Sequence, residues 1–199
     1  MIAITLFSSL GYEEALVPAG LLEASLGEKL FGVPAVTYRS GWLYAGQGFR
    51  FLEDGREITG ALNAGEPLSL TLRGDGMEAA VAVRPAAQES GMASLSGVEG
   101  FSVGHASANE IVYKDCLVSR CHGRFSRDGQ GGFVYTDMSA NGSYVGGQFL
   151  RGSRSLLKEG EEVLVPPLMK MRIEGDTLFY TKPAGFKACA FEEIQEAEK

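Results

Sequence analysis

Residues 101–147 read FSVGHASANEIVYKDCLVSRCHGRFSRDGQGGFVYTDMSANGSYVGG, and this segment decides the fold. Its apolar runs are short, and glycines and small polar residues separate them, as in β-strands that are joined by tight turns. Several polar side chains stand at these turns, and binding residues concentrate on loops that a rigid scaffold positions. The segment therefore predicts a β scaffold that carries a binding site on its loops.

The rest of the chain follows the same pattern. Apolar and polar residues alternate with period two over residues 2–6, 68–72 and 170–173, as they do in half-buried strands. Turn signals rich in glycine and aspartate recur between such runs, and many short strands at this spacing are typical of a β-sandwich or barrel. Residues 21–29 and the last dozen residues are the best helix candidates, and neither has a clear capping pattern. We therefore predict an all-β protein.

An internal repeat indicates two domains. Residues 62–70 and 157–165 both read L-x-x-G-E-x-[LV]-x-[LV], with the two copies 95 positions apart. A leucine, a turn glycine and an alternating strand form a common β unit, so chance similarity is the alternative; two tandem β-sandwiches account for the repeat better. We predict that the small, polar residues 86–97 are a linker between a domain at 1–85 and a domain at 98–183, with a C-terminal tail or connector at 184–199.

Four motifs of the second half occur in a fixed order. They are Gly104-His105, Ser119-Arg120-Cys121-His122, Asp137-Met138-Ser139-Ala140-Asn141-Gly142-Ser143 and Leu157-Lys158-Glu159-Gly160-Glu161. Residues 109–112, which read Asn-Glu-Ile-Val, fit between the first two motifs. In this order and spacing, the motifs resemble those of forkhead-associated (FHA) domains over residues 98–181.

The resemblance implies a β-sandwich of the SMAD/FHA type that recognises phosphothreonine peptides and catalyses no reaction. The residues that it assigns to phosphopeptide contacts are His105, Ser119, Arg120 and Asn141, and those that shape the site are Gly104, His122 and Gly142. On this resemblance, the Ser119 hydroxyl and the Arg120 charge meet the phosphate. Asn141 holds the peptide backbone, and His122 braces the site loops from inside. A phosphate near charge −2 suits such converging donors.

Two positions depart from the family pattern. His105 stands where the family has arginine, which supplies a permanent charge and a planar fork, whereas a neutral imidazole offers one donor. Ala140 stands where many members carry threonine, lysine or arginine near the phosphate. We therefore predict a weakened phosphopeptide site on a scaffold that is used for another protein contact. A working phosphothreonine reader in kinase signalling is the alternative.

The first half keeps the strand pattern but lacks the motifs. Shifting the site positions back by 95 gives Ser9, Ala24, Gly27 and Gly46, which supply no converging phosphate donors. We predict a degenerate FHA-like domain. Such a pair is similar to the N-terminal cytosolic region of the EssC family, the membrane ATPases of type VII secretion with FtsK/SpoIIIE-type motor domains. The resemblance implies a cytoplasmic location for this segment and a membrane-bound parent chain.

The composition excludes several classes of partner. The net charge of −7 and the pI of about 5.0 argue against a nucleic-acid partner. The partner that the FHA resemblance implies is a protein or phosphothreonine peptide. No apolar run reaches the roughly 18 residues that a transmembrane helix needs. Three cysteines cannot all pair, so we expect a reducing compartment. No P-loop motif occurs, and we predict no cofactor.

Two alternative interpretations, a hydrolase and a metal site, have less support in the sequence. Ser119, His122 and Asp137 are the residue types of a hydrolytic triad, but no G-x-S-x-G elbow surrounds the serine. Cys116, Cys121 and His122 are too few for a zinc site, and Cys121 is expected to be a buried thiol, so we predict no metal. The alternating aromatic pairs Trp42/Tyr44 and Phe133/Tyr135 are expected in core or cross-strand packing.

Overall fold

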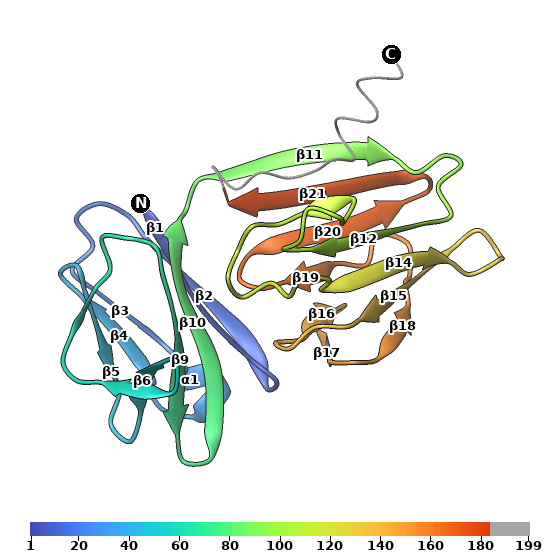
Figure 1. Ribbon diagram of the computed structural model, residues 1–199. Helices are drawn as coiled ribbons and strands as arrows, with labels where there is room; N and C mark the ends of the chain where they lie inside the picture. Colours follow the sequence, from blue (N-terminus) through green and yellow to red (C-terminus); the bar gives the residue numbers. More distant parts are fainter. Residues whose placement is uncertain (184–199) are drawn as a thin grey trace. The chain divides into compact units, whose positions relative to one another are not determined.

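The computed structural model describes residues 1–183, which divide into two compact units, the first at Met1–Ala87 and the second beginning at Gln88 (Figure 1). Both units consist almost entirely of antiparallel strands, so the predicted all-β class with two tandem sandwiches is confirmed. The predicted tail at 184–199 lies outside the described residues. Within residues 1–183, no helix is long and apolar enough to cross a membrane.

The first unit is a sandwich of two sheets. One sheet has the order β2-β1-β10-β9-β6-β7 and the other the order β3-β4-β5-β8. The bounds are β1 Ile2–Ser8, β2 Gly11–Val17, β3 Glu23–Leu26, β4 Val36–Arg39, β5 Trp42–Ala45, β6 Arg50–Glu53, β7 Arg56–Ile58, β8 Leu62–Asn63, β9 Leu68–Gly74 and β10 Met77–Pro85, with one helix, α1, at Glu28–Phe31. Buried apolar residues from both sheets, among them Ile4, Leu43 and Phe51, form one core.

The helix candidate at residues 21–29 contains a strand in place of a continuous helix. Residues 23–26 form β3, which pairs with β4 from Glu23 opposite Arg39 to Leu26 opposite Val36. Gly27 then adopts a φ of +102°, which ends the strand, and only the four residues of α1 are helical. Tertiary pairing outweighs local helix propensity here because an unpartnered helix of this length is marginal in water.

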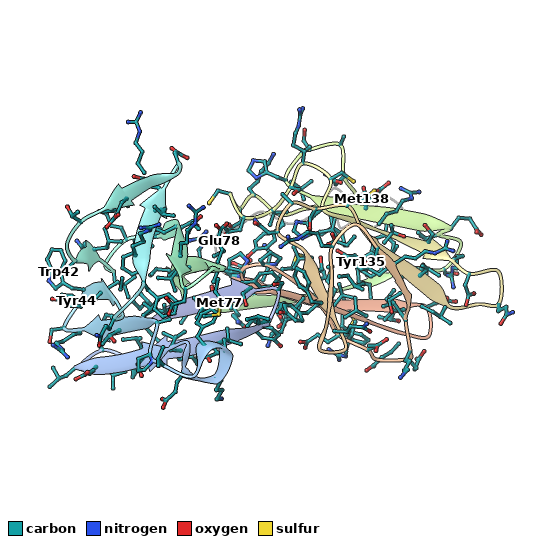
Figure 2. All side chains as sticks on the ribbon, turned by 90° about the horizontal axis from the view of Figure 1, so that it is seen from below. Trp42, Tyr44, Met77, Glu78, Tyr135 and Met138 are labelled. Carbon is teal, nitrogen blue, oxygen red and sulfur yellow. The ribbon has the colours of Figure 1, made fainter. Side chains whose placement is uncertain are left out.

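The two alternating aromatic pairs differ in burial: the pair in the second unit is buried and the pair in the first unit is exposed. Phe133 and Tyr135 are buried in the core of the second unit, as expected. Trp42 and Tyr44 on β5 are 46% and 42% exposed (Figure 2). Leu43 between them is buried in the core of the first unit. Of the two arrangements expected for this pair, core packing is therefore wrong, because an alternating pattern does not say which of its two faces is buried. On the exposed face, the cross-strand neighbours of Trp42 and Tyr44 are Arg39 and Thr37.

The second unit is also a two-sheet sandwich. Its sheets have the orders β11-β21-β20-β19-β16-β17 and β13-β12-β14-β15-β18. The bounds are β11 Gln88–Ser94, β12 Gly100–Gly104, β13 Ile111–Val112, β14 Gly123–Arg127, β15 Phe133–Asp137, β16 Ser143–Val145, β17 Gln148–Leu150, β18 Arg154–Leu156, β19 Val163–Val165, β20 Met169–Glu174 and β21 Thr177–Pro183. Phe101 and Phe125 stack in its core with ring centroids 4.5 Å apart.

The linker predicted at 86–97 is replaced by a strand. Residues 88–94 form β11, which pairs with β21 along its whole length, and only two alanines separate β10 from β11. The segment is small and polar because it is an exposed edge strand. Gly91 in its middle lies against the ring of Tyr180, where a Cβ atom would overlap the ring. A glycine in a strand often marks such a close approach.

The two units share one arrangement of their first and last strands. In the first unit, the first strand β1 lies next to β10, the last strand, and β9 lies on the other side of β10. In the second unit, the first strand β11 likewise lies next to β21, the last described strand, and β20 lies on the other side of β21. Both arrangements are antiparallel. The second unit therefore depends on its C-terminal strand for a central sheet position.

We expect a chain that ends at Glu174 to lose the folded second unit. The truncation removes β21 and the buried side chains of Leu178 and Tyr180, and it leaves the backbone groups of β20 and β11 without their sheet partner. Thermal unfolding followed by circular dichroism would then show only the transition of the first unit. A chain that ends at Pro183 is the control and should keep both transitions. Two transitions in the shorter chain would contradict this role of β21.

Candidate recognition site

The candidate site lies on three loops at one end of the second unit: 105–110 after β12, 113–122 before β14, and 138–142 between β15 and β16. Two backbone hydrogen bonds join the first two loops. His105 N–H donates to the Ser119 carbonyl at 2.8 Å, and Ala106 N–H donates to the Arg120 carbonyl at 3.0 Å. A Cβ atom at Gly104 would overlap that Arg120 carbonyl, so only glycine fits there. The structure thus brings His105, Ser119 and Arg120 together.

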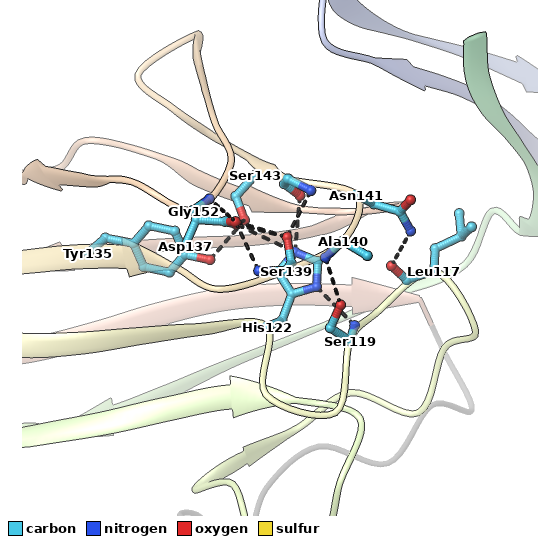
Figure 3. Close-up of polar contacts among 11 residues, drawn as sticks. Leu117, Ser119, His122, Tyr135, Asp137, Ser139, Ala140, Asn141, Ser143 and Gly152 are labelled. Atoms are coloured by element: carbon cyan, nitrogen blue, oxygen red, sulfur yellow. Dashed lines mark hydrogen bonds and ion pairs between the residues drawn. The ribbon is translucent and has the colours of Figure 1, made fainter.

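His122 joins the second loop to the third. Its ring is fully buried, Nδ1 accepts a hydrogen bond from Ser119 N–H at 3.1 Å, and Nε2–H donates to the Gly142 carbonyl at 3.0 Å (Figure 3). Because one nitrogen accepts and the other donates, the contacts fit the neutral Nε2–H tautomer. Burial lowers the pKa of His122, and the opposing effects of the Gly142 carbonyl and of Asp137 do not outweigh it.

This burial makes the second unit sensitive to acid. The folded state holds His122 neutral, whereas an unfolded imidazole gains a proton near pH 6.5, so the unfolded state binds more protons below that pH. We expect the free energy of unfolding to fall between pH 7.5 and 5.5, by at most about 1.4 kcal/mol per pH unit. Urea titrations at several pH values measure this. His122→Gln should flatten the dependence, and His105→Gln, the only other histidine, should retain it. An equal slope in all three proteins would rule out His122 as the cause.

Asp137 is the hub beneath the third loop. One carboxylate oxygen accepts hydrogen bonds from the N–H and the hydroxyl of Ser139, both at 3.0 Å, and from Gly152 N–H at 3.2 Å. The other accepts the Ser143 hydroxyl at 2.6 Å. Ser139 Oγ in turn accepts Gly142 N–H at 2.8 Å. The buried carboxylate therefore holds loop 138–142 from below, a role that was not assigned to it from the sequence.

The network continues to a buried tyrosine. The Tyr135 hydroxyl lies 2.8 Å from Ser143 Oγ, and because the Ser143 hydroxyl donates to Asp137, Tyr135 is the donor of this pair. Burial raises the pKa of Tyr135 well above its ordinary range, so the phenol remains a donor at all physiological pH values. The chain of Tyr135, Ser143 and Asp137 thus keeps its hydrogen-bond directions at neutral pH.

The side chains of Ser119 and Asn141 each bond to a backbone group of the other's loop. Ser119 Oγ accepts Ala140 N–H at 3.0 Å, which leaves its hydroxyl hydrogen to be donated to a ligand. The Asn141 side-chain amide donates to the Leu117 carbonyl at 2.8 Å, which fixes the side chain and leaves its carbonyl oxygen as an acceptor (Figure 3). The backbone groups of Ala140 and Leu117 were missed by sequence reasoning, since any residue type can supply them.

His105 has one ring nitrogen committed. Nδ1 lies 3.0 Å from the Asp115 carbonyl, which can only accept, so Nδ1 carries the hydrogen. In the neutral ring Nε2 therefore holds a lone pair, and only the protonated ring can donate from Nε2 to an anion. Lys114 Nζ donates to the His105 carbonyl at 2.8 Å, and the Arg120 side chain is exposed nearby. His105, Ser119 and Arg120 line one pocket.

The geometry does not form a hydrolytic triad. Both His122 nitrogens are bonded to backbone groups, and neither is bonded to the Ser119 hydroxyl. The Asp137 carboxylate is 3.9 Å from His122 Nε2, on the side away from Ser119. Within the described residues, no group of three His, Cys, Asp or Glu side chains could hold a metal ion. Cys121, which was expected to be buried, is exposed, and so is Cys116.

Two backbone hydrogen bonds locate the equivalent positions in the first unit. Ala35 N–H donates to the Leu26 carbonyl and Gly46 N–H to the Ala35 carbonyl, each at 2.8 Å. In the second unit, His122 N–H donates in the same way to Val103, and Met138 N–H to His122. Ala35 thus stands in the place of His122. The uniform shift by 95 is wrong at the site, because the segment that leads to this position is shorter in the first unit.

The first unit lacks the chemistry of the site at these positions. Strand pairing places Gly27-Glu28 at the position of Gly104-His105, and Ala45 at the position of Asp137. The Gly27 and Lys29 N–H groups donate to the Glu13 carboxylate at 2.8 and 2.9 Å. Glu28, with a carboxylate side chain, takes the place of His105. Alanines, Ala35 and Ala45, take the places of His122 and Asp137.

Comparisons with known proteins concern the fold of the chain and the family of its second unit. Residues 101–165 match the family model of the FHA domain. The chain is similar in fold to the N-terminal FHA domain from EssC, a component of the bacterial Type VII secretion apparatus, with a TM-score of 0.61 and 15% identity over 94% of this chain and 95% of that chain. No curated protein matches the chain.

Two further similar structures cover only part of the chain. One is the FHA-2 domain from the Mycobacterium tuberculosis ABC transporter Rv1747, with a TM-score of 0.35 and 28% identity over 41% of this chain and 72% of that chain. The other is the N-terminal FHA domain from S. cerevisiae Rad53p in complex with a phosphothreonine peptide, with a TM-score of 0.34 and 19% identity over 58% of this chain and 89% of that chain.

Proposed function

The second unit of this chain belongs to the FHA domain family, and on that premise we propose that the chain is a non-catalytic protein-recognition module with a weakened phosphopeptide site. The observation that carries the proposal is the pairing of Ser119 and Asn141. Two loops present a hydroxyl donor and a fixed amide side by side, and each side chain is held by a backbone group of the other loop. A peptide backbone and its side chain fit such a pair of donor and acceptor groups.

The phosphate contacts of this site are incomplete. Ser119 supplies one neutral donor and Arg120 an exposed charge, whereas the neutral His105 ring turns a lone pair toward any anion. Hydrogen bonds from charged donors are about twice as strong as neutral ones, so a phosphate gains less here than beside an arginine fork. We therefore expect protein recognition with a small contribution from the phosphate at neutral pH.

We further propose that the chain is the cytosolic N-terminal part of a larger, membrane-bound ATPase of type VII secretion. Two observations support this: the likeness in fold to the EssC domain extends over nearly the whole of both chains, and the first unit has lost the site residues while keeping the strand pairing. The first unit is then a degenerate FHA-like domain. Sequencing the reading frame beyond Lys199 tests the proposal, which requires membrane spans followed by P-loop ATPase domains.

A peptide-binding experiment tests the recognition function. A phosphothreonine peptide library and its unphosphorylated counterpart are titrated against the full chain by fluorescence anisotropy at pH 7.5. We expect selected peptides to bind with less than about a tenfold preference for the phosphorylated form, equivalent to about 1.4 kcal/mol. Ser119→Ala should abolish that preference, and Ser126→Ala on β14 is the control.

A strong phosphate preference, of a hundredfold or more, would instead favour the working phosphothreonine reader. The hydroxyl hydrogen that Ser119 retains for a ligand is the observation on which that alternative depends. If neither peptide set binds, the proposed recognition function is wrong.

A further inference from the structure

Two thiols stand on the rim of the recognition site. Cys116 and Cys121 are exposed, and both line the pocket that also contains Ser119 and Arg120. They form no metal site with neighbouring ligands in the described part of the chain. Their placement beside the Ser119 hydroxyl gives any group attached to either sulfur access to the same pocket.

Hydrogen bonds hold the backbone around both thiols in place. Val118 N–H donates to the Asp115 carbonyl at 3.1 Å and Leu117 N–H to the Asp115 carboxylate at 3.0 Å, which closes a turn that contains Cys116. Cys121 lies between the Arg120 carbonyl, which accepts Ala106 N–H and the Asn109 amide, and His122, whose N–H is bonded to Val103. Because the loop is held on both sides of each thiol, an attached group cannot move away from the pocket with the backbone.

We propose that Cys116 and Cys121 are sites of reversible S-thiolation by low-molecular-weight disulfides of the glutathione type, and that the adduct closes the recognition site. This inference rests on the proposed recognition function. The cysteine thiolate attacks one sulfur of the reagent, a protein–reagent S–S bond forms and the reagent's own S–S bond breaks. The protein sulfur is oxidised, the departing sulfur is reduced, and it takes up the proton that the protein thiol released. Excess thiol reverses the step.

The surroundings suit this reagent and this consequence. Arg120 lines the pocket and Lys114 lies on the same loop, and these two cations outnumber the one carboxylate of the turn around Cys116, that of Asp115, so the positive charge attracts an anionic disulfide. Reactive cysteines are typically exposed and in electropositive surroundings. Once attached, a tripeptide is far larger than the Ser119 hydroxyl beside it and carries negative charge. It therefore blocks a peptide by its size and repels a phosphate by its charge.

The experiment uses the full chain with Cys189→Ser, since that cysteine lies outside the described residues. The protein is incubated with oxidised glutathione, the adducts are located by intact-mass and peptide mapping, and binding of the selected phosphothreonine peptides is measured before and after. We expect adducts on Cys116, Cys121 or both, at least a tenfold loss of peptide affinity, and recovery with dithiothreitol. The Cys116→Ser/Cys121→Ser variant should bind the peptide equally well with and without the reagent.

The outcomes separate this inference from the proposed function. No adduct at either cysteine, a disulfide between the two cysteines in place of an adduct, or an adduct that leaves peptide affinity unchanged would each overturn the inference. Reduced protein that binds no peptide contradicts the recognition function. In that case the proposed block of peptide binding by the adduct is wrong too, and the mass analysis still decides whether the two thiols are modified. Adducts formed equally fast on the urea-unfolded chain would overturn the role assigned to the charged pocket.

Discussion

His105→Arg should raise the affinity for phosphothreonine peptides by about ten- to a hundredfold at pH 7.5. The physical reason is the state of the imidazole, whose Nδ1–H is used by the Asp115 carbonyl, so the neutral ring presents no donor to the phosphate. A guanidinium at the same position is always charged and offers a planar fork to two phosphate oxygens. Hydrogen bonds to charged groups contribute about 1.5–3 kcal/mol each, which corresponds to the expected gain.

The pH dependence of binding identifies the imidazole as the cause. Because Nδ1–H of His105 is bonded to the Asp115 carbonyl, only an imidazole with hydrogens on both nitrogens could donate to the phosphate, and any such pH-dependent contribution should be absent in His105→Ala and His105→Arg. The phosphate itself loses charge near pH 6, and the His105→Arg variant should show only this loss. Calorimetric titrations of both proteins and of His105→Ala measure the difference. Parallel pH profiles in all three would contradict the assignment.

Asp137→Ala should destabilise the second unit by about 3–5 kcal/mol, because hydrogen bonds to a charged group contribute about 1.5–3 kcal/mol each and several are lost together. The substitution leaves the Ser139 N–H and the Ser143 hydroxyl buried without their acceptor, and it removes the hydrogen bond from the N–H of Gly152, which is exposed. Loop 138–142 should lose its conformation with them, so peptide binding should fall even where the protein remains folded. Urea unfolding followed by far-UV circular dichroism gives the free energy.

A matched control is available at the β14–β15 turn. The Asp128 carboxylate also accepts two backbone N–H groups, from Gln130 at 2.7 Å and Gly132 at 2.9 Å, but it lies near the surface, where water can replace it. Asp128→Ala should therefore cost only about 1 kcal/mol. If the two substitutions cost the same, Asp137 is an ordinary turn residue and the hub assigned to it does not exist.

Local patterns in the sequence were sufficient for the fold class. Period-two alternation and recurring turn residues predict short antiparallel strands, because a strand with one buried face must alternate and a tight turn needs glycine or a small polar residue. The motifs from Gly104 to Gly142 placed the site loops in order along the chain. The same patterns failed at residues 88–94, where an exposed edge strand carries no apolar alternation and reads as a linker.

The positions of the loops relative to one another were beyond any local pattern. Ser119 and Asn141 are 22 positions apart in the chain. The groups that fix their side chains are backbone groups of Ala140 and Leu117, and such groups cannot be recognised from the residue type. The orientation of His105 likewise depends on one carbonyl, that of Asp115. The resemblance of the motifs to the FHA family pattern identified the missing arginine, but only the tertiary contact shows that Nδ1 carries the hydrogen and that Nε2 of a neutral ring holds a lone pair.

What the sequence determined by itself is the alternation of strands and turns, the order of the site motifs and the substitution of His105 for arginine. Tertiary structure decided which face of each strand is buried, as the exposed Trp42 and Tyr44 show, and which strand fills the sheet position of β21. It also decided that Cys116 and Cys121 share a pocket with Ser119. The reason is physical: strand propensity acts between neighbours in the chain, whereas burial, hydrogen-bond partners and tautomers are set by groups that meet only after folding.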